Sequence, residues 1–244
     1  MKTQEKLNFQ SEKIDVDWIS FKFQSLEIAS QRKLVNYLFE LGFNCFVQSG
    51  KLRTLENEEL KVSRLNPNSV LFVKDGPYWD GTLLHFSGKN AKQFYQYAKT
   101  NSINWNLFSN AVLSRLDLCY ISDVPIDSES VEDFFYCCHA KLKLNVNYEK
   151  NKEGQILKLG NRRSNKFSRI YIEQNRLKFE HEMKGSFIKQ YSQYLTTNSW
   201  NDFEFLLSQH FFHYLGSQLL VVDSPYLAWL SKKSDHYNLK LHQL

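Results

Sequence analysis

An arginine and an aspartate alternate with leucines in one strand-like stretch of the sequence, Arg115-Leu116-Asp117-Leu118. Side chains two residues apart share one face of a β-strand, so Arg115 and Asp117 are predicted to point the same way. A charged side chain in mid-strand is costly unless it is solvated or paired. Asp117 therefore has two interpretations: it pairs with Arg115 on a wet sheet face, or it offers oxygen to a hard cation such as Mg²⁺ or Mn²⁺.

Two glutamates alternate in the same way in a later stretch, Lys178-Phe179-Glu180-His181-Glu182. The alternation places Glu180 and Glu182 on one face, and two carboxylates about 7 Å apart along a strand repel each other. A metal ion or a basic neighbour would relieve this repulsion. If this strand pairs near the strand of Asp117, the carboxylates of all three residues converge; the simpler interpretation is a solvent-facing edge.

The positive charge of the chain is concentrated between residues 150 and 178. This segment contains nine Lys or Arg and two Glu, a net charge of +7, whereas the whole chain carries +5. Phosphate backbones are the commonest partners of such a segment, and a solvated basic loop is the alternative. Gly160 lets the backbone approach a phosphate closely. The candidate phosphate contacts in the segment are Arg162, Arg163, Ser164, Lys166 and Arg169.

A tyrosine, Tyr171, lies two residues after Arg169 and is predicted to share its strand face. A guanidinium beside a phenol favours the ionised form of the phenol. That is the form a tyrosine nucleophile needs to attack a phosphate. The alternative is a half-buried structural tyrosine, the usual situation among the 13 tyrosines of the chain.

Hydrophobic periodicity predicts the elements that position these residues. Strands and helices intermix without a βαβ rhythm, which indicates an α+β fold, a largely antiparallel β-sheet with packed helices. The same pattern is compatible with two related strand-helix halves. Strands are predicted at residues 14–23, 44–48, 69–74, 82–87, 112–121, 156–160, 168–173 and 176–183, and helices at 30–41, 91–99, 128–139, 191–195 and 202–220.

Composition predicts an intracellular globular protein. Of the 244 residues, 42% are hydrophobic and 23% charged, as in packed domains. The four cysteines form no disulfide framework, which favours a reducing compartment. We expect no secretory signal and no membrane span, because no stretch reaches roughly 18 apolar residues. A GxxxxGK[ST] segment is absent from the sequence, so an NTP-driven motor is not expected.

Two groups of potential metal ligands are interpreted as structural. His210 and His213 are three residues apart on a predicted helix, but their neighbours are aromatic and the sequence offers no third ligand. Cys137-Cys138-His139 lacks the two-residue gap of zinc motifs. Packing is the favoured interpretation of the histidines, and zinc is not expected at the cysteines.

Taken in order, these segments resemble the replication initiation factor family, the trans-acting initiators of rolling-circle plasmids and some filamentous phages. The resemblance covers residues 14–190, with 191–244 as a C-terminal helical segment that completes or extends this domain. The segments that carry the resemblance are Val16-Asp17-Trp18-Ile19-Ser20-Phe21, Leu84-His85-Phe86-Ser87-Gly88-Lys89, Arg115-Leu116-Asp117, Gly160-Asn161-Arg162-Arg163-Ser164, Arg169-Ile170-Tyr171 and Lys178-Phe179-Glu180.

The resemblance implies a metal-dependent endonuclease that nicks and closes one DNA strand by transesterification. Tyr171 would keep the 5′-phosphate covalently and free a 3′-OH, with Mg²⁺ or Mn²⁺ held by Asp117 and Glu180 and, as an additional ligand, Glu182. The implied partner is origin DNA, single-stranded or supercoiled, with a homodimer and a host helicase as further expectations, and the implied setting is the cytoplasm of a bacterium or a plasmid-bearing organelle. The implied DNA contacts are Arg115, Arg162, Arg163, Ser164, Lys166 and Arg169.

Three departures from the family pattern bear on catalysis rather than on fold. The first is Ile172-Glu173-Gln174, which stands where the family usually has a basic residue. The second is a pair of substitutions: Asn161 follows Gly160, and Lys178 replaces an arginine. The third is the short link from Tyr171 to Glu180, which predicts a tight hairpin at Gln174-Asn175. They leave two further hypotheses: a DNA-binding protein on the same fold that does not cut, and a metal-dependent nuclease that uses water, with Tyr171 only structural.

Overall fold

The computed structural model describes residues 15–24, 26–49, 69–74, 81–125, 146–151, 154–173, 176–189, 191–192, 203 and 205–206. The helix predicted at 128–139, most of the helices predicted beyond residue 190, Cys137-Cys138-His139, His210 and His213 lie outside these residues. The predicted boundary between 14–190 and 191–244 is therefore not addressed by the fold.

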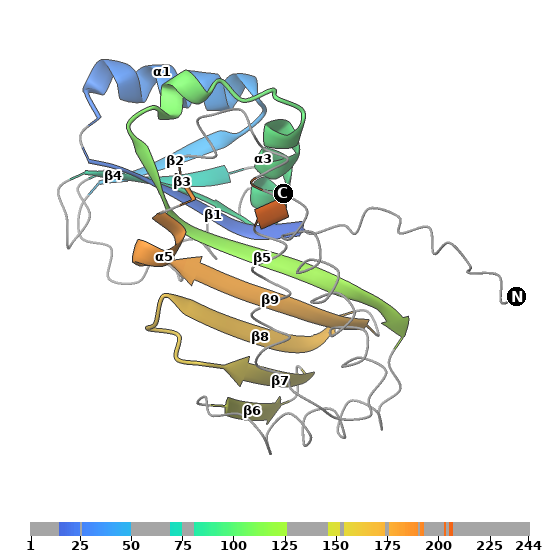
Figure 1. Cartoon of the computed structure of the whole chain (residues 1–244). Helices are drawn as coiled ribbons and strands as arrows, with labels where there is room; N and C mark the ends of the chain where they lie inside the picture. Colours follow the sequence, from blue (N-terminus) through green and yellow to red (C-terminus); the bar gives the residue numbers. More distant parts are fainter. Residues whose placement is uncertain are drawn as a thin grey trace, which may run out of the picture.

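One sheet of nine strands forms the framework of the described residues, in the order β2-β3-β4-β1-β5-β9-β8-β7-β6 (Figure 1). All neighbours pair antiparallel except β2 and β3, which are parallel. The predicted α+β class with a largely antiparallel sheet is thus confirmed. The strands are β1 (Asp15–Phe23), β2 (Asn44–Ser49), β3 (Ser69–Lys74), β4 (Thr82–Ser87), β5 (Ala111–Pro125), β6 (Val146–Asn151), β7 (Gly154–Leu159), β8 (Lys166–Glu173) and β9 (Arg176–Lys184).

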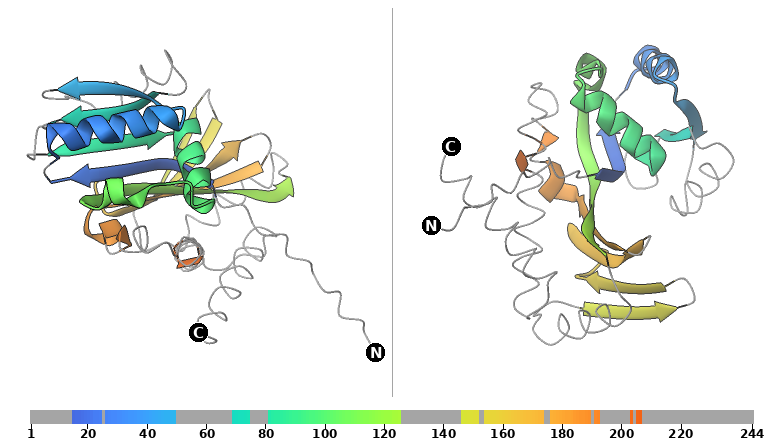
Figure 2. Two further views of the ribbon diagram at one scale, coloured as in Figure 1. Left: turned by 90° about the horizontal axis from the view of Figure 1, so that it is seen from above. Right: turned by 90° about the vertical axis from the view of Figure 1, so that its right-hand side faces the viewer.

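Helices cover the half of the sheet that contains β1 to β4. Helix α1 (Ile28–Glu40) contacts β2, and α3 (Lys89–Lys99) packs on β1 and β4, as the two views in Figure 2 show. Helix α1 ends at Glu40, shortly before Gly42, whose φ of +87° is the left-handed conformation common after helix ends. Two shorter helices follow in the described residues: a 3₁₀ helix, Trp105–Phe108, and the α-helix α5, Gly185–Lys189. Among the described residues, no helix is both long and apolar enough to cross a membrane.

An aromatic cluster joins α3 to the sheet. The rings of Phe86 and Phe94 have centroids 4.3 Å apart, and Phe21 lies 5.6 Å from Phe94 and 5.1 Å from Phe108. All four rings are buried, and each buried Phe contributes about 1.5–3 kcal/mol of hydrophobic stabilisation. This rigid half supports β1 and, through it, β5, the first of the three strands that carry the charged residues singled out above.

Candidate functional site

Strands β5, β9 and β8 are neighbours in the sheet and bring the charged residues onto one face (Figure 1). Residues that pair directly across a ladder have side chains on the same side of the sheet. The opposite face carries the apolar alternates, such as Leu116 and Phe179, which are buried in the core. The residues that pair across the ladders are Asp117 with Glu182, Arg169 with Glu180, and Tyr171 with Lys178.

Arg115 holds the two most buried carboxylates of this face together. Its Nε and Nη2 donate to Asp117 at 2.9 and 2.7 Å, and Nη2 also donates to Glu182 Oε2 at 3.1 Å. The guanidinium lies 4.0 Å from the centre of the Trp18 ring, a cation–π contact. The Arg115–Asp117 pair predicted from the sequence therefore exists, but the prediction of a wet face was wrong, because Asp117 is only 1% exposed.

The second and third carboxylates are also held by basic side chains. Lys184 Nζ donates to Glu182 Oε1 at 2.6 Å, and Arg169 Nη2 lies 2.9 Å from Glu180 Oε2. Glu180 and Glu182 are 6% and 2% exposed, so the alternative of a solvent-facing edge does not apply. Burial raises the pKa of Glu180, and the Asp117 charge raises it further, while Arg169 opposes both.

The pKa of Asp117 is determined by the same opposing effects as that of Glu180. Burial raises the pKa of Asp117 more than the hydrogen bond and charge of Arg115 lower it, and the neighbouring Glu182 charge adds to the rise. Burial is thus the main cause of the raised pKa values of Asp117 and Glu180, and the neighbouring carboxylates add to it. Within the described residues, no group of three His, Cys, Asp or Glu is assembled closely enough to hold a metal ion.

Tyr171 is half-buried at the edge of this face, beside Lys178. Burial, followed by the charge of Glu180, raises the pKa of Tyr171 to about 12, although a hydrogen bond and charge from Lys178 lower it. The prediction that a guanidinium would favour the phenolate was therefore wrong, because Arg169 is engaged by Glu180 instead. The phenol is neutral at neutral pH in this arrangement.

Buried Lys178 forms an ion pair with half-buried Asp17, which sequence reasoning did not single out as functional. Lys178 Nζ lies 2.6 Å from Asp17 Oδ2 and 3.6 Å from Glu173 Oε1, and its side chain is 6% exposed. Burial alone would lower the pKa of Lys178, but the hydrogen bond and charge of Asp17, with the hydrogen bond of Tyr171, raise it. Lys178 is therefore a permanent cation beside the phenol. The alternation that placed Glu180 on this face could have placed Lys178 there too.

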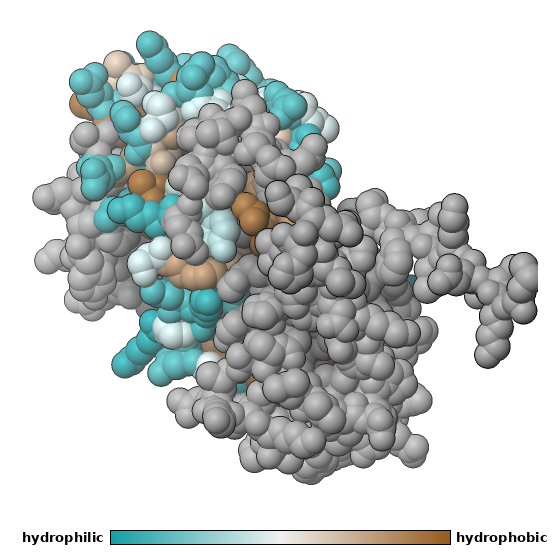
Figure 3. Space-filling model, viewed as in Figure 1, coloured by the Kyte–Doolittle hydropathy of each residue, from teal (hydrophilic) through white to brown (hydrophobic). Residues whose placement is uncertain are grey.

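The turn between β7 and β8 presents the basic residues. Gly160 has a φ of +87°, and Asn161 Oδ1 accepts a hydrogen bond of 2.9 Å from the Arg163 backbone. The Ser164 hydroxyl donates to the carbonyls of Asn161 and Lys166, so it stabilises the turn. Arg162 and Arg163 are exposed, and Figure 3 shows hydrophilic side chains at this end of the sheet.

Lys166 is placed differently from the arginines of the turn. Its Nζ lies 4.0 Å from the centre of the Phe187 ring, which follows β9 in α5. Desolvation lowers the pKa of Lys166. Lys166 thus lies at the base of the turn, against α5.

Comparison with known proteins identifies the fold. No family model matches the chain, and no curated protein matches its sequence. The chain is similar to a solved structure, the rolling circle replication initiator protein from Geobacillus stearothermophilus, with 13% identity and a TM-score of 0.54 over 91% of this chain and 97% of that one. The chain therefore has the α+β fold of a rolling-circle replication initiator, and the resemblance seen in the sequence is confirmed at the level of the fold.

Proposed function

We propose that this protein initiates rolling-circle DNA replication by binding DNA and nicking one strand with Tyr171. The observation that carries the proposal is the placement of a tyrosine, a buried cation and acidic residues on one face of β5, β9 and β8, next to an exposed basic turn. The fold of a replication initiator supports it. The nucleophile, the metal ligands and the DNA contacts are part of the proposal.

The proposed reaction is a transesterification. The Tyr171 oxygen attacks the scissile phosphorus, the bond to the 3′ oxygen breaks, and a 5′-phosphotyrosine link forms. The phenol proton leaves to solvent, and the departing 3′ oxygen takes up a proton to become a free 3′-OH. Lys178 stabilises the phenolate through its charge, and Arg169 and Arg162 offset the charge of the phosphate.

The residues that would hold a metal ion in the proposal are Asp117, Glu180 and Glu182, which would have to move closer together, because they form no metal-sized cluster in the described residues. Carboxylate oxygens suit Mg²⁺ and Mn²⁺, and a cation would oppose both the burial and the neighbouring negative charge that raise the pKa values of Asp117 and Glu180. Arg115 Nη2 contacts both Asp117 and Glu182, so these two carboxylates already share one positive charge. A bound divalent ion would polarise the scissile phosphate.

The test is covalent capture of DNA from a pool of single-stranded oligonucleotides with a randomised centre, which removes the need to know the origin. The full chain is incubated with the pool in Mn²⁺, in Mg²⁺ and in EDTA, and adducts are resolved in denaturing gels. We expect an adduct that depends on the metal. Cleavage without an adduct would instead indicate a nuclease that uses water.

Binding without cleavage under any metal would favour a second candidate function, a DNA-binding protein that does not cut. A specific observation favours this candidate: burial raises the pKa of Tyr171 to about 12, so its phenol is uncharged, and the carboxylates of Asp117, Glu180 and Glu182 are each paired with a basic side chain.

Removing Arg162 and Arg163 together is expected to weaken the salt dependence of single-stranded DNA binding. Each phosphate contact contributes about 0.7 to the slope of log affinity against log salt, so the R162A/R163A variant should lose about 1.4 from that slope. The measurement is fluorescence anisotropy at several salt concentrations. The matched control is the exposed pair Arg32 and Lys33 on α1, whose replacement by Ala should leave the slope unchanged. Equal losses in the two variants would contradict the proposed interface.

Replacing Lys178 by Met is expected to slow adduct formation about 10²-fold, because the phenolate loses its stabilising cation and the pKa of Tyr171 rises further. Lys178→Arg should retain most of the rate. Below the phenol pKa, the wild-type rate should increase with pH, since the anionic fraction grows as protons are removed. The measurement is single-turnover adduct formation between pH 6 and 9, a range below the phenol pKa in which the anionic fraction rises about tenfold per pH unit. An unchanged rate and pH profile in Lys178→Met would show that Lys178 is only structural.

A further inference from the structure

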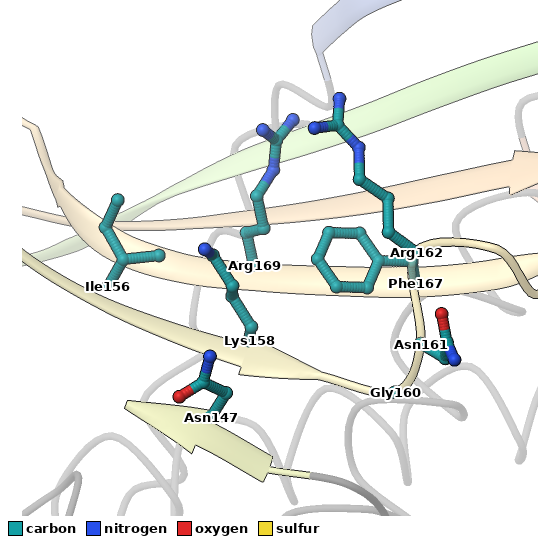
Figure 4. Close-up of a pocket in the computed structure, with 8 residues that line it drawn as sticks. All are labelled: Asn147, Ile156, Lys158, Gly160, Asn161, Arg162, Phe167 and Arg169. Carbon is teal, nitrogen blue, oxygen red and sulfur yellow. The ribbon is translucent and has the colours of Figure 1, made fainter. Parts of the chain in front are cut away.

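A cavity of about 420 Å³ opens on the strands next to Tyr171. It lies across β6, β7 and β8, and Figure 4 shows its side chains. Its volume falls in the range of small-molecule sites, about 300–1,000 Å³, and it is concave, unlike the exposed turn above it. A concave site of this size is suited to one flexible unit of a ligand rather than to a rigid double helix.

Three cations line the cavity from neighbouring elements. Lys158, Arg162 and Arg169 point to the same side of the sheet in Figure 4, and their side chains are 30, 49 and 27% exposed. Each reaches a carboxylate at one edge, at 2.6, 3.9 and 2.9 Å respectively, so all are held in place while part of each faces solvent. A cluster of this kind suits an anion that carries its charge at one end.

The rest of the lining is apolar or carries amides. The Phe167 ring lies between Arg162 and Arg169 in Figure 4, and Asn147 reaches in from β6. The Phe167 residue is 4% exposed, so its ring offers a base an edge rather than a stacking face, and amides pair with the edges of bases. Anion-binding residues beside an aromatic wall and an amide match the chemistry of a nucleotide.

The position of the cavity relates it to the proposed nucleophile. Arg169 and Tyr171 are two residues apart on β8 and on the same face, which is about 7 Å along a strand. Ile156, which lines the cavity, is the direct partner of Tyr171 in the β7–β8 ladder. A nucleotide in the cavity would therefore be a near neighbour of a phosphate presented to Tyr171.

We infer that this cavity binds one unstacked nucleotide of single-stranded DNA next to the scissile phosphate, with the base against Phe167 and Asn147 and its phosphate held by Lys158, Arg162 and Arg169. The inference rests on the proposed function, since it requires that DNA be presented to Tyr171. In this inference, residues of strands β6 to β8 determine which base binds beside the nick. A base must leave its stack to enter such a site, which selects single-stranded over duplex DNA.

The experiment compares the binding of two labelled octamers to the full chain in EDTA. One octamer is (dT)8, and the other has the same phosphates but abasic sugars throughout, so the ratio of the two affinities isolates the contribution of the bases. For the wild type we expect a ratio of about 10, at the low end of the about 5- to 100-fold that a stacked base contributes, because Phe167 offers only an edge. Phe167→Leu and Asn147→Ala should each lower that ratio at least about threefold.

Controls separate this effect from folding and from charge. Phe39→Leu makes the same change on α1, where the ring is 67% exposed, and should keep the wild-type ratio. Asn147 is exposed, so Asn147→Ala tests the cavity even if Phe167→Leu, which alters a buried ring, does not fold. Unchanged ratios in Asn147→Ala and in folded Phe167→Leu would overturn the inference.

The outcome is distinguishable from failure of the proposed function. Lowered ratios without any covalent adduct would reject nicking and keep the nucleotide site. Adduct formation with unchanged ratios would keep nicking and reject the nucleotide site. Absence of binding to both octamers would reject both.

Discussion

Replacing Tyr171 by Phe is expected to abolish the covalent protein–DNA adduct, with a loss of about 10³-fold or more in single-turnover nicking. The variant removes one oxygen, the atom proposed to attack phosphorus, and keeps the ring that packs at the edge of the sheet. DNA affinity should stay within about twofold of the wild type, because the basic turn is untouched. The measurement is the amount of adduct in denaturing gels, with binding measured in parallel by anisotropy.

A second strand tyrosine provides the control for this change. Tyr148 lies on β6 and pairs with Leu157, so its side chain is on the face opposite to Tyr171. Tyr148→Phe should therefore form the adduct at the wild-type rate. Retention of the adduct in Tyr171→Phe would show that another residue is the nucleophile, and would remove the central element of the proposed function.

Replacing Arg115 by Met is expected to destabilise the protein by about 3–5 kcal/mol. The side chains of Asp117 and Glu182 are each 2% exposed, and Arg115 contacts both, so its removal leaves two buried charges without their shared partner. The measurement is the free energy of unfolding from urea denaturation. The deficit should shrink as the pH falls, because burial already raises the pKa of Asp117 and the loss of Arg115 removes the group that lowers it, so protonation of Asp117 removes its unpaired charge.

The control for Arg115 is an ion pair at the surface. Lys158 lies 2.6 Å from Glu149, with both side chains at least 30% exposed, so Lys158→Met should cost no more than about 1 kcal/mol.

Mn²⁺ provides a further readout for the proposed metal ligands. If Asp117 and Glu182 bind a cation, Mn²⁺ should restore part of the stability of Arg115→Met and raise that of the wild type less. Equal effects of Mn²⁺ on the two proteins would contradict these ligands.

The faces of the strands could be predicted from the sequence because they depend only on the alternation of residues. Arg115 and Asp117 were assigned to one face, as were Glu180 and Glu182, and the structure places all of them together. The pairing of strands could not be predicted in the same way. Whether Asp117 lies opposite Glu180 or Glu182 depends on a register that the turns and the core determine, and the two glutamates are equivalent in the pattern.

Other features depend on contacts between distant segments. Strand β6 was not predicted, because Val146–Asn151 is largely polar and has no clear alternation. Asp17 lies at a register shift between β1 and β5, so its approach to Lys178 is not encoded in any local pattern. The pKa of Tyr171 was misjudged for the same reason, since it depends on burial and on the ion pairs that neighbouring strands form.

The Lys178–Asp17 ion pair joins β9 to β1 although β5 runs between them. Besides burial, the charge of Asp17 raises the pKa of Tyr171. Asp17 also accepts a hydrogen bond from Lys178, the same lysine that hydrogen-bonds to the Tyr171 phenol. Detachment of the first residues of β1 would therefore make the phenol more acidic. By thermodynamic reciprocity, loss of the phenol proton weakens the attachment of β1, so that ionisation of the tyrosine and fraying of the first strand favour each other.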